Sequence, residues 1–545
     1  MKKIIEWFKA LPWAGAAKAA FSRWDAWSVS PRYGIIGRMK HVFVIIATFA
    51  YACALSCADG HTVYRIPFGR VASMDPIRAS DELSAKCVAL VYEPLLEVDY
   101  YARPYRLKSC VCELPEVSGD GLTYTFRIID GVKFRNGSDV TAADVKRCLD
   151  RLADKANASP GMWTMANVKS VEAADARTVS ITLKKPSHVF KWLMAMPFAG
   201  VMAQDGTGSG AYRLKSWRKN HEMVFVRNDA YREKVQIDEL RFLVVDDVST
   251  QWLMFLGGEL DYLGSVSRDN WDAVIGKDGN LLPQLKAKGM TLKTSSSLSV
   301  FYVGFNMKDP VLGANKKLRQ ALNCAFDFPA WTRFLNNRVV ASNGPLPPGI
   351  DGRLETPFAY AYDEAKAKKL LAEAGYPNGI DPKTNRRLHL EISIGRATQD
   401  AREMAELMAS FYDRVGIDLV ARYMTWDAFL TAVNEGRTQM FNLGWIGDYP
   451  DPENFLQLFH SKNVSPGANH GSYVNPEFDR AFDALDWKAA QEIVREDCPW
   501  IFLHSPKVYS LVWNHVDNYI PTDFAYGIEK HLRIVPQQQT PTDNH

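Results

Sequence analysis

The chain has 545 residues, of which 47% are hydrophobic and 23% are charged. This length is sufficient for two or more packed domains. Residues 1–56 hold eight of the 65 Lys and Arg residues but only two of the 62 Asp and Glu residues, so the remainder is slightly acidic. A nucleic-acid-binding protein would show a strongly basic face, and the composition therefore argues against nucleic acid as a partner.

An uncharged apolar run occupies residues 42–56. It is shorter than the roughly 20 residues that a membrane-spanning helix needs. Basic residues directly before it, Arg38 and Lys40, are typical of a secretory signal peptide, which we predict over residues 39–56. Residues 1–38 contain four Trp and several basic residues. They are either an untranslated extension before a true start at Met39 or a segment that lies in a membrane interface.

The apolar run ends at Leu55-Ser56-Cys57, which resembles the processing site of bacterial lipoproteins, although Ala54 stands where that motif usually has Leu. The resemblance implies that Cys57 becomes the lipidated first residue, and several acyl chains hold a domain stably at a membrane. The alternative is cleavage near Ala50-Tyr51-Ala52, which would release a free periplasmic protein. We favour the lipid anchor.

Six further cysteines follow Cys57, at positions 87, 110, 112, 148, 324 and 498. Six cysteines allow 15 complete pairings, and the sequence does not choose among them. Cys110 and Cys112 are too close for a zinc motif, and no His or Cys cluster lies nearby. We expect buried thiols with at most one or two disulfides, no metal site and no cofactor.

Strand and helix patterns alternate through the first half of the chain. Alternating or continuous apolar runs predict strands at 63–68, 124–129, 179–183, 223–227 and 240–245. Helical spacing covers 82–96 and 251–255. Thr141 and Asp144 form a capping box that predicts a helix over 142–152.

The second half repeats this alternation. Strands are predicted at 301–305, 388–394, 419–424 and 440–443, and helices at 318–326, 363–374, 400–415 and 426–434. Gly375 and Gly416 end two of these helices. Such alternation predicts α/β lobes with mostly parallel sheets.

Several motifs together resemble the peptide- and nickel-type solute-binding proteins that serve ABC importers. The clearest is Gly444-Trp-Ile-Gly-Asp-Tyr-Pro-Asp-Pro-Glu-Asn-Phe455, which follows the strand at 440–443. A second is Tyr124–Val145, with the segment Asp130-Gly-Val-Lys-Phe134. Shorter matches in the family's order include Gly208–Tyr212, Tyr302–Asn306, Leu370–Gly375 and Cys498–Phe502. The resemblance extends from about residue 61 to about residue 535.

The resemblance implies a two-lobed periplasmic-binding-protein fold, of the large class with an extra subdomain in lobe I. Two hinge strands would join the lobes, near 299–306 and 501–506, and the lobes would close on ligand. The implied division is lobe I over 57–299, lobe II over 300–503 and a C-terminal return to lobe I over 504–545.

Asp448 is the first candidate ligand-binding residue. It matches the family residue that pairs with the ligand's α-ammonium, and a charge-assisted hydrogen bond of this kind contributes about 1.5–3 kcal/mol. The alternative is that Asp448 only caps a turn before Tyr449-Pro450. Asp451 stands before Pro452, a pair that suits the first positions of a helix, and we expect a structural role for it.

Four other residues are candidates for the ligand site. Trp445 would form the cleft wall, or else pack in the core, and Tyr449 lies beside Asp448. Arg396 follows a predicted strand and would clamp a ligand carboxylate with both guanidinium nitrogens. Ser80 would line the cleft from lobe I.

We therefore interpret the chain as an extracytoplasmic receptor, with no catalytic residues, that delivers peptides to ABC permease subunits and their ATPases. We expect it to be a monomer held at the membrane through Cys57. A receptor of the same fold for nickel chelate, haem or a sugar is the alternative within this class. A secreted hydrolase that uses Asp448 and Asp451 as paired carboxylates is the alternative outside it. No nucleophile-elbow, zinc-protease or Walker motif supports that alternative.

Overall fold

The computed structural model describes residues 61–266, 270–276, 278–465 and 467–535. The predicted signal peptide and Cys57 lie outside the described residues. Thr62 and the residues after it belong to one compact unit. Among the described residues, no helix is both long enough and apolar enough to cross a membrane.

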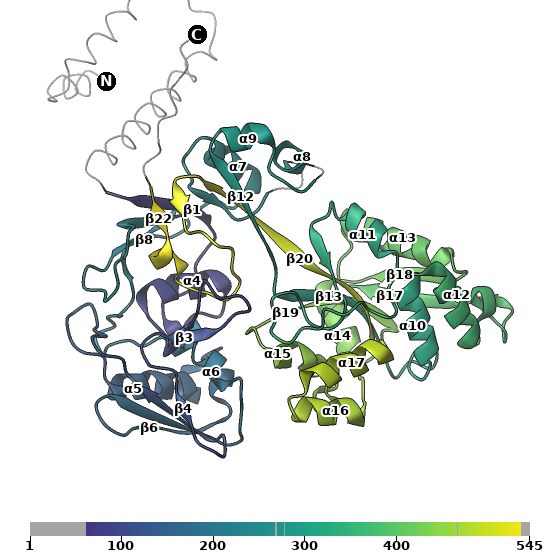
Figure 1. Cartoon of the computed structure of the whole chain (residues 1–545), viewed down its shortest axis with the longest axis horizontal. Coiled ribbons are helices and arrows are strands. Elements are labelled where there is room, and N and C mark those ends of the chain that lie inside the picture. Colours follow the sequence, from purple (N-terminus) through teal and green to yellow (C-terminus); the bar gives the residue numbers. More distant parts are fainter. Residues whose placement is uncertain (1–60, 267–269, 277, 466, 536–545) are drawn as a thin grey trace, which may run out of the picture. The chain divides into compact units, whose positions relative to one another are not determined.

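The first sheet has the strand order β1-β10-β9-β8 (Figure 1). Its strands are β1 (Val63–Phe68), β8 (Tyr212–Arg218), β9 (Glu222–Arg227) and β10 (Glu239–Val244). Helix α4 (Glu82–Val91) begins at Asp81, whose side chain accepts from the Ser84 backbone N–H. Apolar side chains of α4 join those of the sheet in one core, which includes Cys87, Leu90, Phe225 and Phe242.

A second, antiparallel sheet has the order β4-β5-β7-β6. Its strands are β4 (Glu116–Val117), β5 (Thr123–Arg127), β6 (Val168–Ala173) and β7 (Thr178–Leu183). Helix α5 (Ala142–Ala153) packs on it and begins with the predicted capping box between Thr141 and Asp144. We call these two sheets and their helices lobe I.

Lobe II is a mixed sheet with helices on both faces. Its strands, in sheet order, are β13 (Ser299–Phe305), β19 (Met440–Ile446), β17 (His389–Ile394) and β18 (Asp418–Tyr423). Successive residues of β13 serve opposite faces: Val303 and Phe305 belong to one core, and Val300 and Tyr302 to another. The first core includes helices α10 (Lys316–Ala325), α12 (Glu364–Glu373) and α13 (Gln399–Asp413). The second includes α14 (Trp426–Asn434), α15 (Pro452–Leu456), α16 (Pro476–Asp483) and α17 (Trp487–Asp497).

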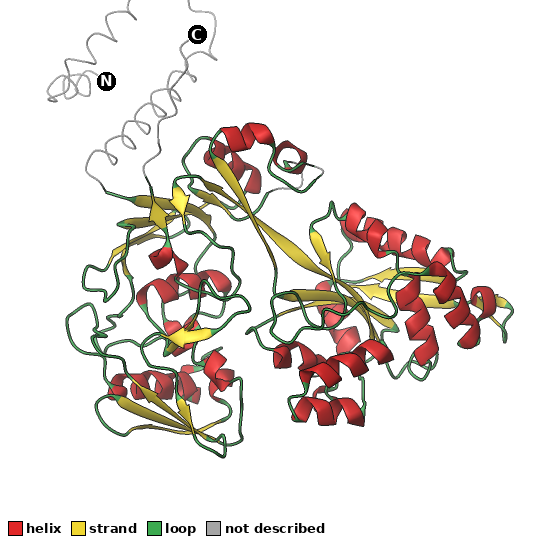
Figure 2. Cartoon of the chain, in the orientation of Figure 1, coloured by secondary structure: helices red, strands yellow, loops and turns green. Residues whose placement is uncertain are grey.

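Two connections join the lobes. Strand β12 (Met290–Ser296) continues through Ser297 and Leu298 into β13. The long strand β20 (Trp500–Trp513) pairs with β13 and with β14 (Val339–Ala341) up to Pro506, and from Lys507 onward it pairs with β12. Figure 2 shows this strand running between the two groups of elements. The change of partner at Pro506 lies at the end of the second predicted hinge.

The remaining elements are short. The strands are β2 (Leu96–Val98), β3 (Leu107–Ser109), β11 (Tyr262–Leu263), β15 (Ile380–Asp381), β16 (Arg386–Arg387), β21 (Val516–Asp517) and β22 (Arg533–Ile534). The helices are α6 (Phe190–Leu193), α7 (Val248–Leu256), α8 (Trp271–Val274), α9 (Pro283–Ala287) and α11 (Phe328–Phe334), with 3-10 turns that include η3 (Met162–Met165) and η8 (Ile528–His531).

The predicted elements are largely confirmed, but the prediction of mostly parallel sheets is wrong. Only β1 with β10 and β17 with β18 and β19 run parallel among the named strands, and the other pairs are antiparallel. Alternation along the sequence sets the order of elements, whereas relative strand direction depends on long-range pairing. The six cysteines in the described part of the chain are all buried and unpaired.

Candidate functional site

The carboxyl ends of β17, β18 and β19 lie at one edge of the lobe II sheet, because β17 is parallel to both of the other strands. Ligands bind beyond such strand ends in open α/β sheets. Arg396 follows β17, Trp426 follows β18, and Asp448 follows β19. The sheet therefore brings the motif at 444–455 and Arg396 to the same edge.

Asp448 is exposed to solvent just beyond the end of β19. The surrounding protein desolvates its carboxylate and raises its pKa, and a hydrogen bond from the Asn454 side chain only partly offsets this effect. That contact is long, at 3.4 Å from Asn454 Nδ2 to Asp448 Oδ2. No salt bridge to Asp448 occurs among the described residues. An accessible carboxylate that lacks a cation and is partly desolvated is suited to bind a positively charged group.

Asn454 organises the motif. It is fully buried at the start of α15, and its Oδ1 accepts from Trp445 Nε1–H at 2.9 Å and from the Asp448 backbone N–H at 3.1 Å. Trp445 itself is half-buried and packs against the second lobe II core. The core packing that was the alternative for Trp445 is thus present, and its backbone stands at the end of β19.

The side chains of Tyr449 and Asp451 are both engaged in hydrogen bonds. Tyr449 is 7% exposed, and its hydroxyl donates a short hydrogen bond to Glu453. Asp451 caps α15 by accepting from the Glu453 backbone N–H at 2.9 Å, with Pro452 at the first helical position. The predicted structural role of Asp451 is confirmed. Tyr449 supports the turn from inside, where a ligand has little access.

Arg396 and Ser80 are both exposed. The guanidinium of Arg396 has only weak partners, with Nε 3.9 Å from Asp400 and Nη2 3.8 Å from the Met404 sulfur. It is therefore available to a ligand carboxylate. Ser80 precedes Asp81, the N-cap of α4, on lobe I.

One edge of β19 is open next to the motif. Pairing with β17 stops at Asn442, whereas pairing with β13 continues to Ile446. Gly447 N–H donates to Leu298 C=O at 2.9 Å, which makes Leu298 and Gly447 a hydrogen-bonded pair. By the alternation of an antiparallel ladder, the backbone groups of Gly444 and Ile446 then point away from β13. The site thus offers free backbone donors and acceptors beside Asp448.

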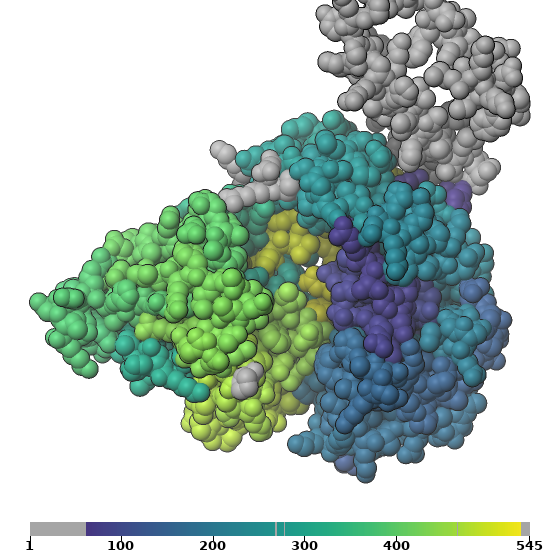
Figure 3. Space-filling view, turned by 180° about the vertical axis from the view of Figure 1, so that it is seen from behind, coloured from purple at the N-terminus to yellow at the C-terminus, as the bar shows by residue number. Residues whose placement is uncertain are grey.

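Lobe I contributes a group of charged side chains around Tyr526. Desolvation raises the pKa of Tyr526 to about 12, and the negative charges of Glu82, Asp523 and Asp448 add to this effect. The negative charges that raise the pKa of Tyr526 thus come from both lobes. In Figure 3 the surface is hollowed between the green residues of lobe II and the purple and blue residues of lobe I.

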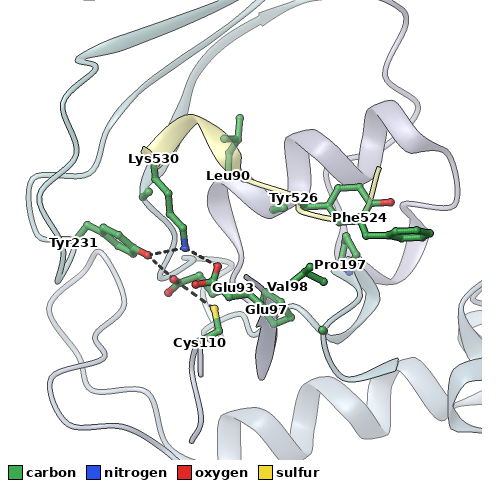
Figure 4. A pocket seen from close by; sticks show the side chains of 15 residues that line it. Leu90, Glu93, Glu97, Val98, Cys110, Pro197, Tyr231, Phe524, Tyr526 and Lys530 are labelled. Carbon is green, nitrogen blue, oxygen red and sulfur yellow. Dashed lines mark hydrogen bonds and ion pairs between the residues drawn. The ribbon is translucent and has the colours of Figure 1, made fainter. Parts of the chain in front are cut away.

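A pocket in lobe I borders this region at Phe524 and Tyr526 (Figure 4). It encloses about 480 Å³, including its open mouth. Its charged groups are already paired: Lys530 Nζ lies 2.6 Å from Glu97 Oε2, and Glu93 Oε2 lies 2.7 Å from Arg232 Nη1. Because these groups satisfy one another, the pocket holds lobe I together and offers little to a charged ligand.

The sequence does not single out His188, Asp523 or Tyr526. His188 Nε2 of lobe I lies 3.2 Å from Asp451 Oδ1 of lobe II, although 263 residues separate them in the chain. No local sequence pattern predicts a contact between residues so far apart in the chain. Among the described residues, no cluster of His, Cys, Asp and Glu is arranged to hold a metal ion.

Comparison with known proteins agrees with this architecture. The glutathione-binding protein GsiB of Escherichia coli K12 is 29% identical over 497 residues, covering 85% of this chain and 92% of that protein. HbpA2 of Haemophilus parasuis superposes with a TM-score of 0.78 at 23% identity, covering 87% of this chain and all of that one. DppA of Helicobacter pylori, in complex with the peptide STSA, gives a TM-score of 0.64 at 23% identity, covering 88% and 99% of the two chains. Residues 106–466 match the family model of the bacterial extracellular solute-binding proteins, family 5. The chain belongs to this family of solute-binding proteins.

Proposed function

We propose that the protein captures short peptides with a free amino terminus between its two lobes and delivers them to an ABC importer. The observation that carries this proposal is Asp448, an accessible and desolvated carboxylate without a cationic partner in the described part of the chain. A ligand ammonium there would gain a charge-assisted hydrogen bond of about 1.5–3 kcal/mol.

The backbone beside Asp448 supports a peptide in particular. Gly444 and Ile446 direct their backbone groups to an open strand edge, and an extended peptide binds such an edge through its main chain. Main-chain binding leaves side-chain preference loose. Arg396, at the end of the neighbouring strand, supplies a cation for the ligand's carboxylate end.

The names of similar proteins agree with a small peptide ligand. GsiB is a glutathione-binding protein, and DppA was solved with the peptide STSA. Glutathione carries one α-ammonium and two carboxylates, which match Asp448 and Arg396 in charge. We include it among the first ligands to test.

The same proposal covers location and partners. We expect an extracytoplasmic monomer that is anchored through a lipidated Cys57, with permease subunits and their ATPases as partners and no enzymatic activity. The lobe boundaries at 57–299, 300–503 and 504–545 belong to this proposal. Metabolic labelling with radioactive palmitate tests the anchor: the wild-type chain should incorporate label, and the Cys57→Ser variant should not.

Mass spectrometry of ligand released by denaturation from freshly purified protein tests the function. A set of short peptides, or glutathione, supports the proposal, and the Asp448→Asn variant should then retain far less ligand. A metal chelate, haem or a sugar would overturn the peptide assignment. If a supplied peptide is cleaved during incubation, the assignment as a receptor is wrong.

A further inference from the structure

Leu298 lies on the connection between the lobes and carries an unusual hydrogen bond. In a regular antiparallel pair, two residues exchange both of their backbone hydrogen bonds. Leu298 C=O accepts from Gly447 N–H at 2.9 Å, as expected for such a pair. Leu298 N–H, however, donates to Asp523 Oδ2 at 2.6 Å. The Asp523 carboxylate thus takes the place of the Gly447 carbonyl in the last rung of the ladder.

Asp523 is fixed to lobe I. Arg103 Nη2 donates to the Pro521 carbonyl at 3.0 Å, and the Asp523 backbone N–H donates to the Tyr105 hydroxyl at 3.4 Å. The Tyr105 ring meets the Phe524 ring edge-on, with centroids 5.8 Å apart. Tyr105 also shares a buried cluster with Leu298. A carboxylate that lobe I holds in place therefore binds the connection between the lobes at Leu298. Leu298 pairs with Gly447, the residue before Asp448.

We propose that Asp523 is a positioning residue that couples the charge of the ligand at Asp448 to the connection between the lobes. This inference rests on the proposed function, because it requires a cationic group at Asp448. A ligand ammonium near both carboxylates keeps Asp523 ionised, and an ionised acceptor holds Leu298 N–H more strongly than a neutral one.

The electrostatic surroundings of Asp523 agree with this coupling. Asp523 is exposed to solvent, but desolvation raises its pKa, and the carboxylate of Glu82 adds to the rise. The Leu298 N–H, Lys86 and Arg103 act in the opposite direction. The Asp523 carboxylate stands at the rung that joins Leu298 to Gly447, and Asp448 is the next residue along the chain. A cation bound at Asp448 would therefore favour the ionised form of Asp523.

Calorimetry with two probes, trialanine and N-acetyl-trialanine, tests the coupling across three proteins. The Asp523→Asn variant keeps an oxygen that accepts from Leu298 N–H but removes the charge. We expect its affinity for trialanine to fall about 5-fold or more. Its affinity for the acetylated peptide should stay within about 2-fold of wild type. Asp517→Asn is the matched control, because Asp517 lies in the same segment but pairs with Arg533 at 2.7 Å.

The pH profile separates charge coupling from a purely structural role. Wild-type affinity for trialanine should fall on acidification with two protonation steps, and the Asp523→Asn variant should lose one of them. If Asp523→Asn binds trialanine as wild type does, or loses affinity equally for both peptides, the inference is wrong while the proposed function stands. If the wild-type protein binds neither peptide, nor any other peptide with a free amino terminus, both fail together.

Discussion

His188 of lobe I and Asp451 of lobe II are in contact between the two lobes, with Nε2 and Oδ1 3.2 Å apart. The His188 ring also lies 5.6 Å from the Trp487 ring at the start of α17. Asp451 at the same time caps α15, the helix that holds Asn454 in place. The contact therefore links the position of lobe I to the helix that supports the ligand motif.

The two roles of Asp451 can be separated by substitution. Asp451→Ala should lower the free energy of unfolding by about 1 kcal/mol through the lost N-cap, with a further loss for the pair with His188. Asp451→Ser keeps the cap and loses only the pair, so it should cost less. Chemical denaturation of both variants, alone and combined with His188→Ala, measures the pair. Equal losses for Ala and Ser would contradict the assignment of Asp451 as the cap.

Replacement of Asp448 should weaken peptide binding and stabilise the ligand-free protein. Asp448→Asn should weaken binding of a free-amine peptide about 10-fold or more, because the charge-assisted hydrogen bond is lost. In the ligand-free protein the same change should raise the free energy of unfolding by less than about 1 kcal/mol, since the carboxylate is desolvated but still accessible to water. Calorimetry and thermal unfolding measure the two effects. A loss of stability together with binding would point to a structural Asp448.

Peptide affinity should depend on pH through Asp448. Desolvation raises the pKa of this carboxyl in the folded protein, so protonation begins at a higher pH than for an ordinary aspartate. Binding requires the ionised form, and affinity should therefore fall as the pH drops through this raised pKa. For folding the sign is opposite: the raised pKa contributes stability at low pH, and this contribution is lost as the pH rises through it. Titration calorimetry between pH 4 and 8 should show the decline for wild type, and Asp448→Asn should lose the protonation step that belongs to Asp448.

Two proline substitutions test the open edge of β19. The Ile446 N–H points away from β13, so Ile446→Pro should leave the sheet intact and weaken peptide binding about 10-fold through one lost main-chain hydrogen bond. The Trp445 N–H points toward Val300 of β13, so Trp445→Pro should break the ladder and destabilise the fold by about 3 kcal/mol. Circular dichroism melts and calorimetry distinguish the two variants. If Ile446→Pro binds peptide normally, the ligand does not use this edge.

Asn454 should matter for both fold and site. It is fully buried and accepts from two donors, Trp445 Nε1–H and the Asp448 N–H. Asn454→Leu would leave both donors unsatisfied, and we expect a loss of about 2–3 kcal/mol in the free energy of unfolding. Asn454→Asp keeps the acceptor but places a second carboxylate beside Asp448, and should weaken the fold less. Urea denaturation of the two variants measures the difference in their free energies of unfolding.

Local sequence signals predicted the local structure well. The helix at 426–434 has the predicted bounds, and both the capping box of α5 and the N-cap of α15 form as expected. These features depend on residues within a few positions of one another, so a short stretch of sequence is sufficient to predict them. Arg396 lies at the same sheet edge as the motif at 444–455 for a similar reason, because strand ends follow from apolar runs.

Other features could not be predicted, because they join distant parts of the chain. Asp523 meets Leu298 across 225 residues, and His188 meets Asp451 across 263. The prediction of strand direction was wrong for the same reason, since most of lobe II lies between β13 and β20 in the sequence. Tyr449 stands inside the motif, yet its side chain turns inward because its hydroxyl finds Glu453.

Strand β20 has a consequence for biosynthesis. It pairs with β13 of lobe II and with β12, the strand that leads from lobe I into β13. The segment that follows it supplies Asp523 and Lys530, which fasten the hinge and the lobe I interior. A nascent chain therefore lacks this strand until residues 500–513 have been made. For a protein that we expect to be exported, we expect this delay to favour an unfolded polypeptide that can pass through a translocation pore.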